Sequence, residues 1–161
     1  MIKAPTPWLV HGSFFVGIVF ALLPLPDSVH AARPYLLAML LTYWLMETPL
    51  TVGLGTAFVL GLLADLTSAT LIGEQAMRLV ILAFLVQRFR ARLRFFPLWQ
   101  QALTVGFLLL NDRVVVAAIH AVTGEPQPPL VSWLSPALST VLWPWLFVLL
   151  DLARLRARER S

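Results

Sequence analysis

Six stretches of apolar residues follow one another along the chain, and proline-rich or charged breaks separate them. The clearest breaks are residues 24–26 (Pro-Leu-Pro), Glu47 with Pro49, and the arginine tract at 88–94. A helix of about 20 apolar residues crosses the hydrocarbon core of a bilayer. The pattern therefore predicts six transmembrane helices in a single domain, residues 1–161, with spans at about 8–25, 34–46, 54–65, 75–86, 99–121 and 131–150.

The composition is that of a membrane protein rather than a soluble one. Of the 161 residues, 59% are hydrophobic and 12% are charged, and the mean hydropathy is +0.82. Soluble domains contain about 45–50% apolar residues and about 25% charged residues. The predicted fold class is therefore an all-α integral membrane protein with its six helices in one bundle.

Residue usage excludes several kinds of site. The chain has no cysteine, so disulfides and thiolate chemistry are excluded, and its three histidines are far apart in sequence. No Ser-His-Asp, zinc or phosphate-loop signature appears. We therefore expect no catalytic residue, no metal and no cofactor. The net charge of +4 does not indicate nucleic-acid binding, because most cations form two short tracts beside apolar runs.

The two basic tracts predict the orientation. One contains Arg88, Arg90, Arg92 and Arg94, and the other covers residues 154–160. Six spans put both termini on one side, and a cytoplasmic N-terminus places nine basic residues inside, Lys3 among them, against two outside, Arg33 and Arg78. Because loops rich in Lys and Arg stay in the cytoplasm, we predict that both termini are cytoplasmic. Beyond topology, such tracts also suit anionic lipid headgroups or a cytoplasmic protein.

Small residues form two stripes at spacing four. The first stripe is Ser13, Gly17 and Ala21, and the second is Gly53, Ala57 and Gly61, ending in Asp65. Residues four apart share one face of a helix, and in lipid such faces let two backbones approach closely. We expect these residues, together with Gly73 after the third span, to pack against another helix or to contact a partner.

Four ionisable residues within or beside the spans are candidates for a role in the membrane: Glu47, Asp65, Asp112 and Arg113. Asp65 has two open interpretations, a helix-packing or partner-contact carboxylate, or a cap for the turn that follows it. Asp112 and Arg113 need separate partners, because adjacent residues on a helix do not face each other. We expect Arg113 to pair with Asp65 or Glu47, or to line a small wet crevice. Three carboxylates are too few for a proton relay across the membrane.

Two motifs resemble those of the MreD family, bacterial rod shape-determining membrane proteins. The first is FVLGLLADLT at 58–67 followed by LIG at 71–73, similar to the family's Gly-Leu-x-x-Asp region. The second is RLRFFPLWQQ at 92–101, similar to the family's arginine-rich loop and the Phe-Pro-x-Trp-Gln-Gln start of its fifth helix. The length and the plan of six spans without a soluble domain agree with the same family.

The resemblance implies a non-enzymatic scaffold in the bacterial inner membrane that belongs to the cell-elongation machinery and supports cell shape. Its implied partners are MreC first, then MreB and the RodA-type glycosyltransferase with its transpeptidase, beside membrane lipids. The family's fold is similar to that of the S components of energy-coupling-factor transporters. A small-molecule-binding transporter subunit is therefore the alternative. In the scaffold interpretation, one stripe receives the MreC helix and Asp65 fixes its register.

Overall fold

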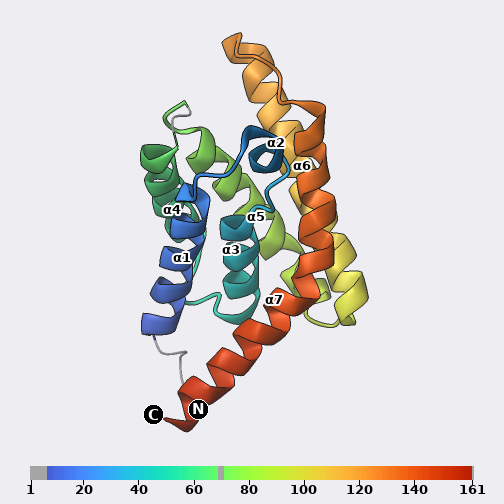
Figure 1. Cartoon of the computed structure of the whole chain (residues 1–161). Coiled ribbons are helices and arrows are strands. Elements are labelled where there is room, and N and C mark those ends of the chain that lie inside the picture. The colour runs from blue at the N-terminus through green and yellow to red at the C-terminus, as the bar shows by residue number, and fades with distance from the viewer. Residues whose placement is uncertain (1–6, 69–70, 161) are drawn as a thin grey trace.

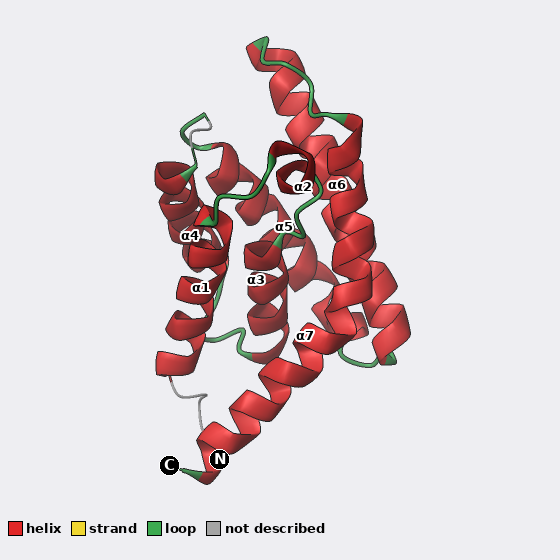
Figure 2. Ribbon diagram, viewed as in Figure 1, coloured by secondary structure: helices red, strands yellow, loops and turns green. Residues whose placement is uncertain are grey.

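The computed structural model describes residues 7–68 and 71–160, and the regular elements within those ranges are all helical (Figures 1 and 2). Among them, six helices have 12 residues or more and correspond to the six apolar runs, so the all-α fold class is confirmed. Lys3 lies outside the described residues. In chain order the elements are α1 (Pro7–Leu22), α2 (Asp27–Ala31), α3 (Leu36–Glu47), α4 (Leu54–Thr67), α5 (Glu74–Leu93), α6 (Leu98–Thr123), the 3-10 turn η1 (Leu130–Trp133) and α7 (Leu134–Glu159).

Prolines and glycines mark where these helices begin and end. Pro26, Pro97 and Pro129 stand immediately before α2, α6 and η1. Proline suits this place because a helix start needs no backbone donor there and its fixed φ is compatible with the first turn. Gly73, with φ of 96°, precedes α5, and Gly124, with φ of 75°, ends α6. Both glycines adopt the left-handed conformation that other residues avoid.

The core of the bundle is α3. All its side chains from Leu37 to Met46 are buried, and α1, α5, α6 and α7 contact it. A helix of 12 residues is about 18 Å long, which is shorter than a hydrocarbon core of about 30 Å. Surrounding helices, rather than lipid, therefore form the environment of α3 (Figure 1).

Two described helical stretches are long and apolar enough to cross a membrane, Leu98–Thr123 and Leu130–Glu159. Only 33% and 28% of their apolar windows are buried inside the molecule, so most of this apolar surface faces outward. The two helices approach closely at Gly106, where a Cβ atom would lie 2.0 Å from Thr140 Oγ1. Apolar outer faces with a glycine at the contact are typical of helices packed in lipid.

Several helices are longer than the predicted spans. The fourth span was expected to end at 86, but α5 continues through the arginine tract to Leu93. The sixth was expected to end at 150, but α7 continues to Glu159. Arginine, alanine and leucine all favour helix, so each basic tract extends the helix that precedes it instead of forming a loop or a tail.

The six long helices alternate in direction, which gives the bundle two distinct ends (Figure 1). We call the end where α5 and α7 finish the arginine end, because both basic tracts lie there. The opposite end, where α5 and α7 begin, is the network end, after the polar contacts described below. The beginning of α1 and the finish of α7 lie at the arginine end, as an even number of spans requires.

Candidate functional site

Asp65 caps the helix that follows it. It lies in the last turn of α4 and is 4% exposed. Its Oδ2 accepts hydrogen bonds from the backbone N–H groups of Gly73 at 2.8 Å and Ala76 at 3.4 Å, and its Oδ1 accepts from Gln75 at 2.9 Å. The first N–H groups of a helix lack partners within the helix, and its dipole favours a negative charge there. The carboxylate thus caps α5 from the end of α4, so the cap and the helix-packing contact are the same interaction.

The stripe on α4 is directed at α5 of the same chain. Ala57 is fully buried. Gly53 stands at the start of α4, and a Cβ atom added to it would lie 3.8 Å from Gln87 Nε2. A Cβ atom on Gly61 would lie 2.2 Å from Ala76 Cα and 2.6 Å from Ala76 N. No side chain fits at such distances, so a glycine here lets the start of α5 lie against α4, where Asp65 can reach it.

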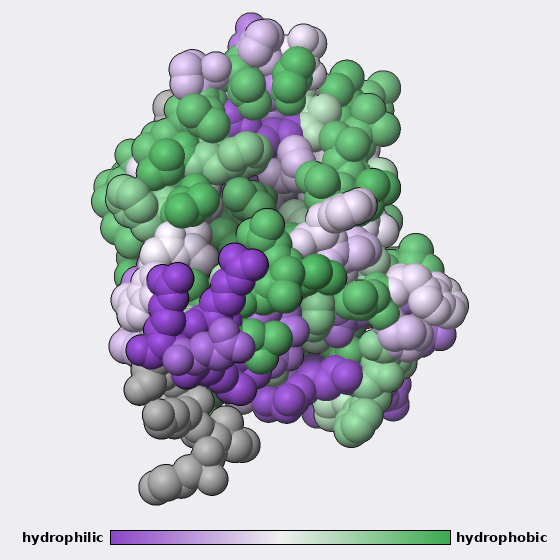
Figure 3. Space-filling view, turned by 60° about the horizontal axis from the view of Figure 1, so that its bottom comes forward, coloured by the Kyte–Doolittle hydropathy of each residue, from purple (hydrophilic) through white to green (hydrophobic). Residues whose placement is uncertain are grey.

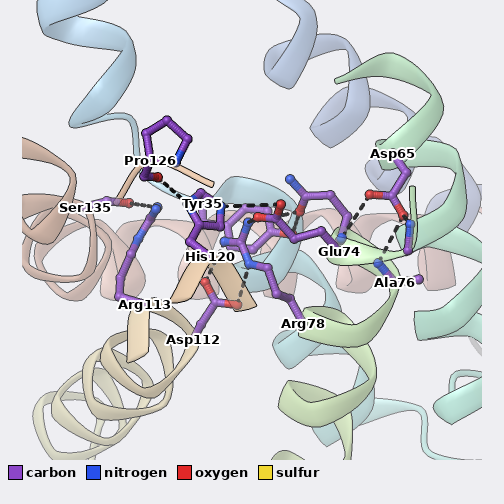
Figure 4. A network of polar contacts seen from close by, with 12 residues as sticks. Tyr35, Asp65, Glu74, Ala76, Arg78, Asp112, Arg113, His120, Pro126 and Ser135 are labelled. Atoms are coloured by element: carbon purple, nitrogen blue, oxygen red, sulfur yellow. Dashed lines mark hydrogen bonds and ion pairs between the residues drawn. The ribbon is translucent and has the colours of Figure 1, made fainter. Parts of the chain in front are cut away.

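Arg78 and Asp112 form a buried ion pair between α5 and α6 (Figure 4). Arg78 Nε donates to Asp112 Oδ1 at 3.0 Å, and Nη2 donates to Oδ2 at 2.6 Å. The ring of Tyr35 lies against the guanidinium, 4.7 Å from its central carbon, and Tyr35 Oη donates to Gln75 Oε1 at 2.5 Å. A bidentate pair fixes both distance and orientation, so α5 and α6 are locked in register.

Glu74 and His120 extend this network toward the loop after α6. Glu74 lies one turn before Arg78, with 3.8 Å between Oε1 and Arg78 Nη1. Its Oε2 is 3.6 Å from His120 Nε2, and His120 Nδ1 is 2.6 Å from the carbonyl oxygen of Pro126. The polar side chains of the network end therefore bond mainly to one another (Figure 4).

Arg113 does not pair with Asp65 or Glu47, and that expectation was wrong. Its Nη2 donates to Ser135 Oγ at 3.2 Å, and the same hydroxyl donates to the carbonyl oxygen of Arg33 at 2.6 Å. Asp65 is committed to the start of α5, and Glu47 lies at the opposite end of the bundle. The expectation that Asp112 and Arg113 have separate partners is what the structure shows.

The stripe on α1 is directed at α3. Trp44 Nε1 donates to Ser13 Oγ at 2.7 Å, and a Cβ atom on Gly17 would lie 2.8 Å from Leu40 Cδ1. Ala21 is exposed, and its carbonyl oxygen accepts from Arg33 Nη1 at 2.6 Å. Both small-residue stripes thus contact helices of the chain itself.

At the arginine end, one arginine from each tract holds the last turn of α3. Arg90 Nε donates to the carbonyl oxygen of Met46 at 3.0 Å, and Arg154 forms an ion pair with Glu47. Burial alone would lower the pKa of the Arg154 guanidinium, but its bond to Glu47 raises that pKa above its usual value. Exposed side chains at this end include Arg88, Arg92 and Arg94.

An apolar groove of about 470 Å³ lies between α1 and α4. Its walls include Phe15 and Ile18 from α1, and Gly55, Val59 and Leu63 from α4. Phe15 is 68% exposed and Val59 is 55% exposed, so the groove opens outward. Within the described residues, no group of three or more His, Cys, Asp or Glu side chains is arranged to hold a metal ion.

The comparisons with known proteins agree with the motifs in the sequence. Residues 3–153 match the family model described as "MreD: rod shape-determining protein MreD". The chain belongs to the MreD family. It is 28% identical over 152 residues, 94% of each chain, to the rod shape-determining protein MreD of Haemophilus influenzae. No solved structure matches the chain.

Membership of the MreD family establishes the general role. MreD proteins are non-enzymatic membrane proteins with a role in rod cell shape. This family assignment agrees with the outward-facing apolar surfaces of α6 and α7. The buried polar residues described above are accordingly parts of a helix-packing framework rather than of a reaction centre.

Sequence reasoning missed several residues that organise this MreD chain. Arg78 was counted only as an outer-side charge, although a basic residue inside an apolar run signals a buried partner. Glu74 stands four residues before it, which is the spacing of an ion pair on one helix face. Gly106 had no such signal, because the contact with Thr140 depends on how α6 and α7 cross.

Proposed function

We propose that this chain is a scaffold in the bacterial inner membrane that holds MreC and, through it, the peptidoglycan-synthesis machinery of cell elongation. The observation that carries the proposal is the groove between α1 and α4. It is open to the outside and mainly apolar, and its lining contains three polar side chains, His11, Thr51 and Thr56, but no Asp, Glu, Lys or Arg. A partner with a single apolar helix can bury that helix against the apolar side chains of the groove without covering a buried ion pair.

Because both small-residue stripes already contact helices of the chain itself, the groove is the more suitable site for a partner helix. Gly17 already contacts α3 and Gly61 already contacts α5, so an MreC helix on either stripe would displace a helix of the chain. Asp65 gives its carboxylate to the start of α5. The groove needs no such displacement, and it lies beside both stripes. In lipid, helix association depends on close packing and not on a hydrophobic driving force, which favours a preformed hollow.

The alternative function, a small-molecule-binding subunit similar to a transporter S component, has weaker support. Ligand pockets combine an apolar wall with a few convergent polar groups. The groove offers mainly apolar side chains, and the polar side chains of the network end are bonded to one another. No observation on the described residues therefore favours this function over the scaffold.

The proposed orientation places the arginine end in the cytoplasm, with MreB and other cytoplasmic partners on that side. Single-cysteine labelling tests it cleanly, because the native chain has no cysteine. A cysteine at Gly124, at the network end, is expected to react with an impermeant reagent added outside the inner membrane. Labelling of that cysteine only from the cytoplasm would reverse the topology.

Affinity purification from membranes tests the scaffold itself. We expect MreC and wall-synthesis proteins to copurify, with no bound vitamin. Gly55→Leu fills the groove but meets no atom of the chain within 4 Å of an added Cβ, so it should reduce MreC recovery without unfolding the protein. Gly12→Leu is the matched control, because Gly12 has equally open surroundings and is not part of the groove wall. Equal MreC recovery from both variants would exclude the groove.

A further inference from the structure

Eight arginines from two distant tracts gather at one end of the bundle. Arg90 and Arg154 are both anchored on the last turn of α3, through Met46 O at 3.0 Å and through Glu47. Figure 3 shows the largest group of strongly hydrophilic residues at this end, with apolar residues over much of the visible surface above it. The two tracts therefore form one surface whose position is fixed by the core helix.

The arginines at this end fall into two groups. Arg90 and Arg154 are half-buried and hold α3, whereas the other six are exposed. Arg158 is one of these six and already makes a contact within the chain, and the five other exposed arginines are Arg88, Arg92, Arg94, Arg156 and Arg160. The carboxylates of the described residues at this end are Glu47, Asp151 and Glu159, and Glu47 is already bound to Arg154. The surface thus carries more positive charge than the side chains around it neutralise.

Apolar side chains among the arginines indicate the depth of this surface. Phe95 is 89% exposed, Trp99 is 62% exposed, and Leu152 and Leu155 are 50% and 48% exposed. Aromatic residues concentrate where the bilayer meets water. A helix of 26 residues such as α7 is about 39 Å long, so its last turns extend beyond a hydrocarbon core of about 30 Å. A bilayer centred on the apolar surface of the bundle would therefore place its phosphates near these arginines.

We propose that this arginine surface binds the headgroups of anionic phospholipids. Guanidinium groups match phosphate oxygens and attract them as charges, and clustered basic residues beside membrane helices attract anionic leaflets. A soluble acidic protein is a poorer match, because the exposed aromatic side chains would then face water. The proposal rests on the proposed function in one respect, which is that the proposed orientation places the arginine surface at the cytoplasmic leaflet.

The test measures lipid binding by the purified full chain in detergent, without partner proteins. The thermal midpoint is followed during titration with phosphatidylglycerol, phosphatidylcholine or inorganic phosphate. We expect phosphatidylglycerol alone to raise the midpoint, with a half-saturating concentration that increases with ionic strength. An equal response to phosphatidylcholine, or an equal response to inorganic phosphate, would overturn the proposal.

Substitutions identify the surface. Changing the five exposed arginines other than Arg158 to Gln should raise the half-saturating concentration at least about tenfold, whereas changing them to Lys should leave it within about threefold because the charge is kept. If the fivefold Gln variant does not fold, as judged by circular dichroism, the two tracts are changed separately, at 88, 92 and 94 or at 156 and 160. Unchanged lipid affinity in the folded Gln variants would contradict the proposal. The same holds if these variants keep their lipid affinity but no longer bind an acidic cytoplasmic protein. MreC recovery is measured separately, so failure here is distinguishable from failure of the scaffold.

Discussion

The two ends of the bundle use charged residues in opposite ways. At the network end, Arg78 and Asp112 are 6% and 4% exposed and bind each other, and Asp65 binds backbone of the same chain. At the arginine end, most of the guanidinium groups are exposed, while Arg90 and Arg154 hold the last turn of α3. Charge at the network end therefore stabilises the fold, whereas charge at the arginine end acts mainly on the surroundings.

The largest effect should come from breaking the buried pair at the network end. Asp112→Asn removes the bidentate partner of the buried Arg78 guanidinium and leaves it only the longer contact with Glu74 at 3.8 Å, and breaking a buried pair costs about 3–5 kcal/mol. We expect a large fall in the thermal midpoint of the protein in detergent. The double variant Arg78→Met, Asp112→Leu removes both charges and should recover most of the loss. A double variant as unstable as Asp112→Asn would show that the pair's charges are not the cause.

A smaller loss is expected where α4 and α5 touch. Gly61→Leu places a side chain where even a Cβ would lie 2.2 Å from Ala76 Cα, so the backbones must separate. Overpacking of this kind costs about 1–3 kcal/mol. The thermal midpoint of Gly61→Leu, compared with that of Gly55→Leu, measures this cost. Gly55→Leu is the control because Gly55 has no atom within 4 Å of an added Cβ. Equal midpoints for the two variants would refute the close approach.

Removal of the cap should cost less again. Asp65→Ala leaves the N–H groups of Gly73 and Gln75 without their acceptor, and loss of a helix cap costs about 0.5–2 kcal/mol. Hydrogen exchange of the first turn of α5 should increase more than that of α3. Asp27→Ala is the control, because Asp27 is exposed at the same end. The cap would be unimportant if the two variants exchanged alike.

The smallest effects on stability belong to the arginine end. Arg154→Gln breaks a partly exposed ion pair with Glu47, and such pairs contribute about 0–1 kcal/mol. We expect a slight fall in the thermal midpoint for Arg154→Gln and no measurable change for Arg92→Gln. If Arg92→Gln lowered the thermal midpoint as much as Asp112→Asn, the two ends would not differ in how their charges affect stability.

The sequence predicted the parts of this fold that depend on residue type and spacing. Apolar runs that end near Pro24, Pro49 or Pro97 predicted the helices. Small residues at a spacing of four predicted the stripes through Gly17 and Gly61. Asp65 was recognised, with its cap left as one of two interpretations. Pairing of Arg113 with Asp65 or Glu47 was one of two alternatives and is not what the structure shows, and the partner of Arg78 was missed. Pairing between α5, α6 and α7 depends on how the helices rotate and cross. That rotation is a property of packing and leaves no local mark in the sequence.

The central claim is that the groove between α1 and α4 receives a helix of MreC. Photoreactive residues at Phe15 and Val59, both exposed groove residues, and at Phe107 on the outer face of α6, 74% exposed, test it directly in cells that express MreC. We expect adducts with MreC from Phe15 and Val59 and none from Phe107. Adducts from Phe107 alone would move the contact to α6, and the absence of MreC adducts from all three positions would contradict the claim.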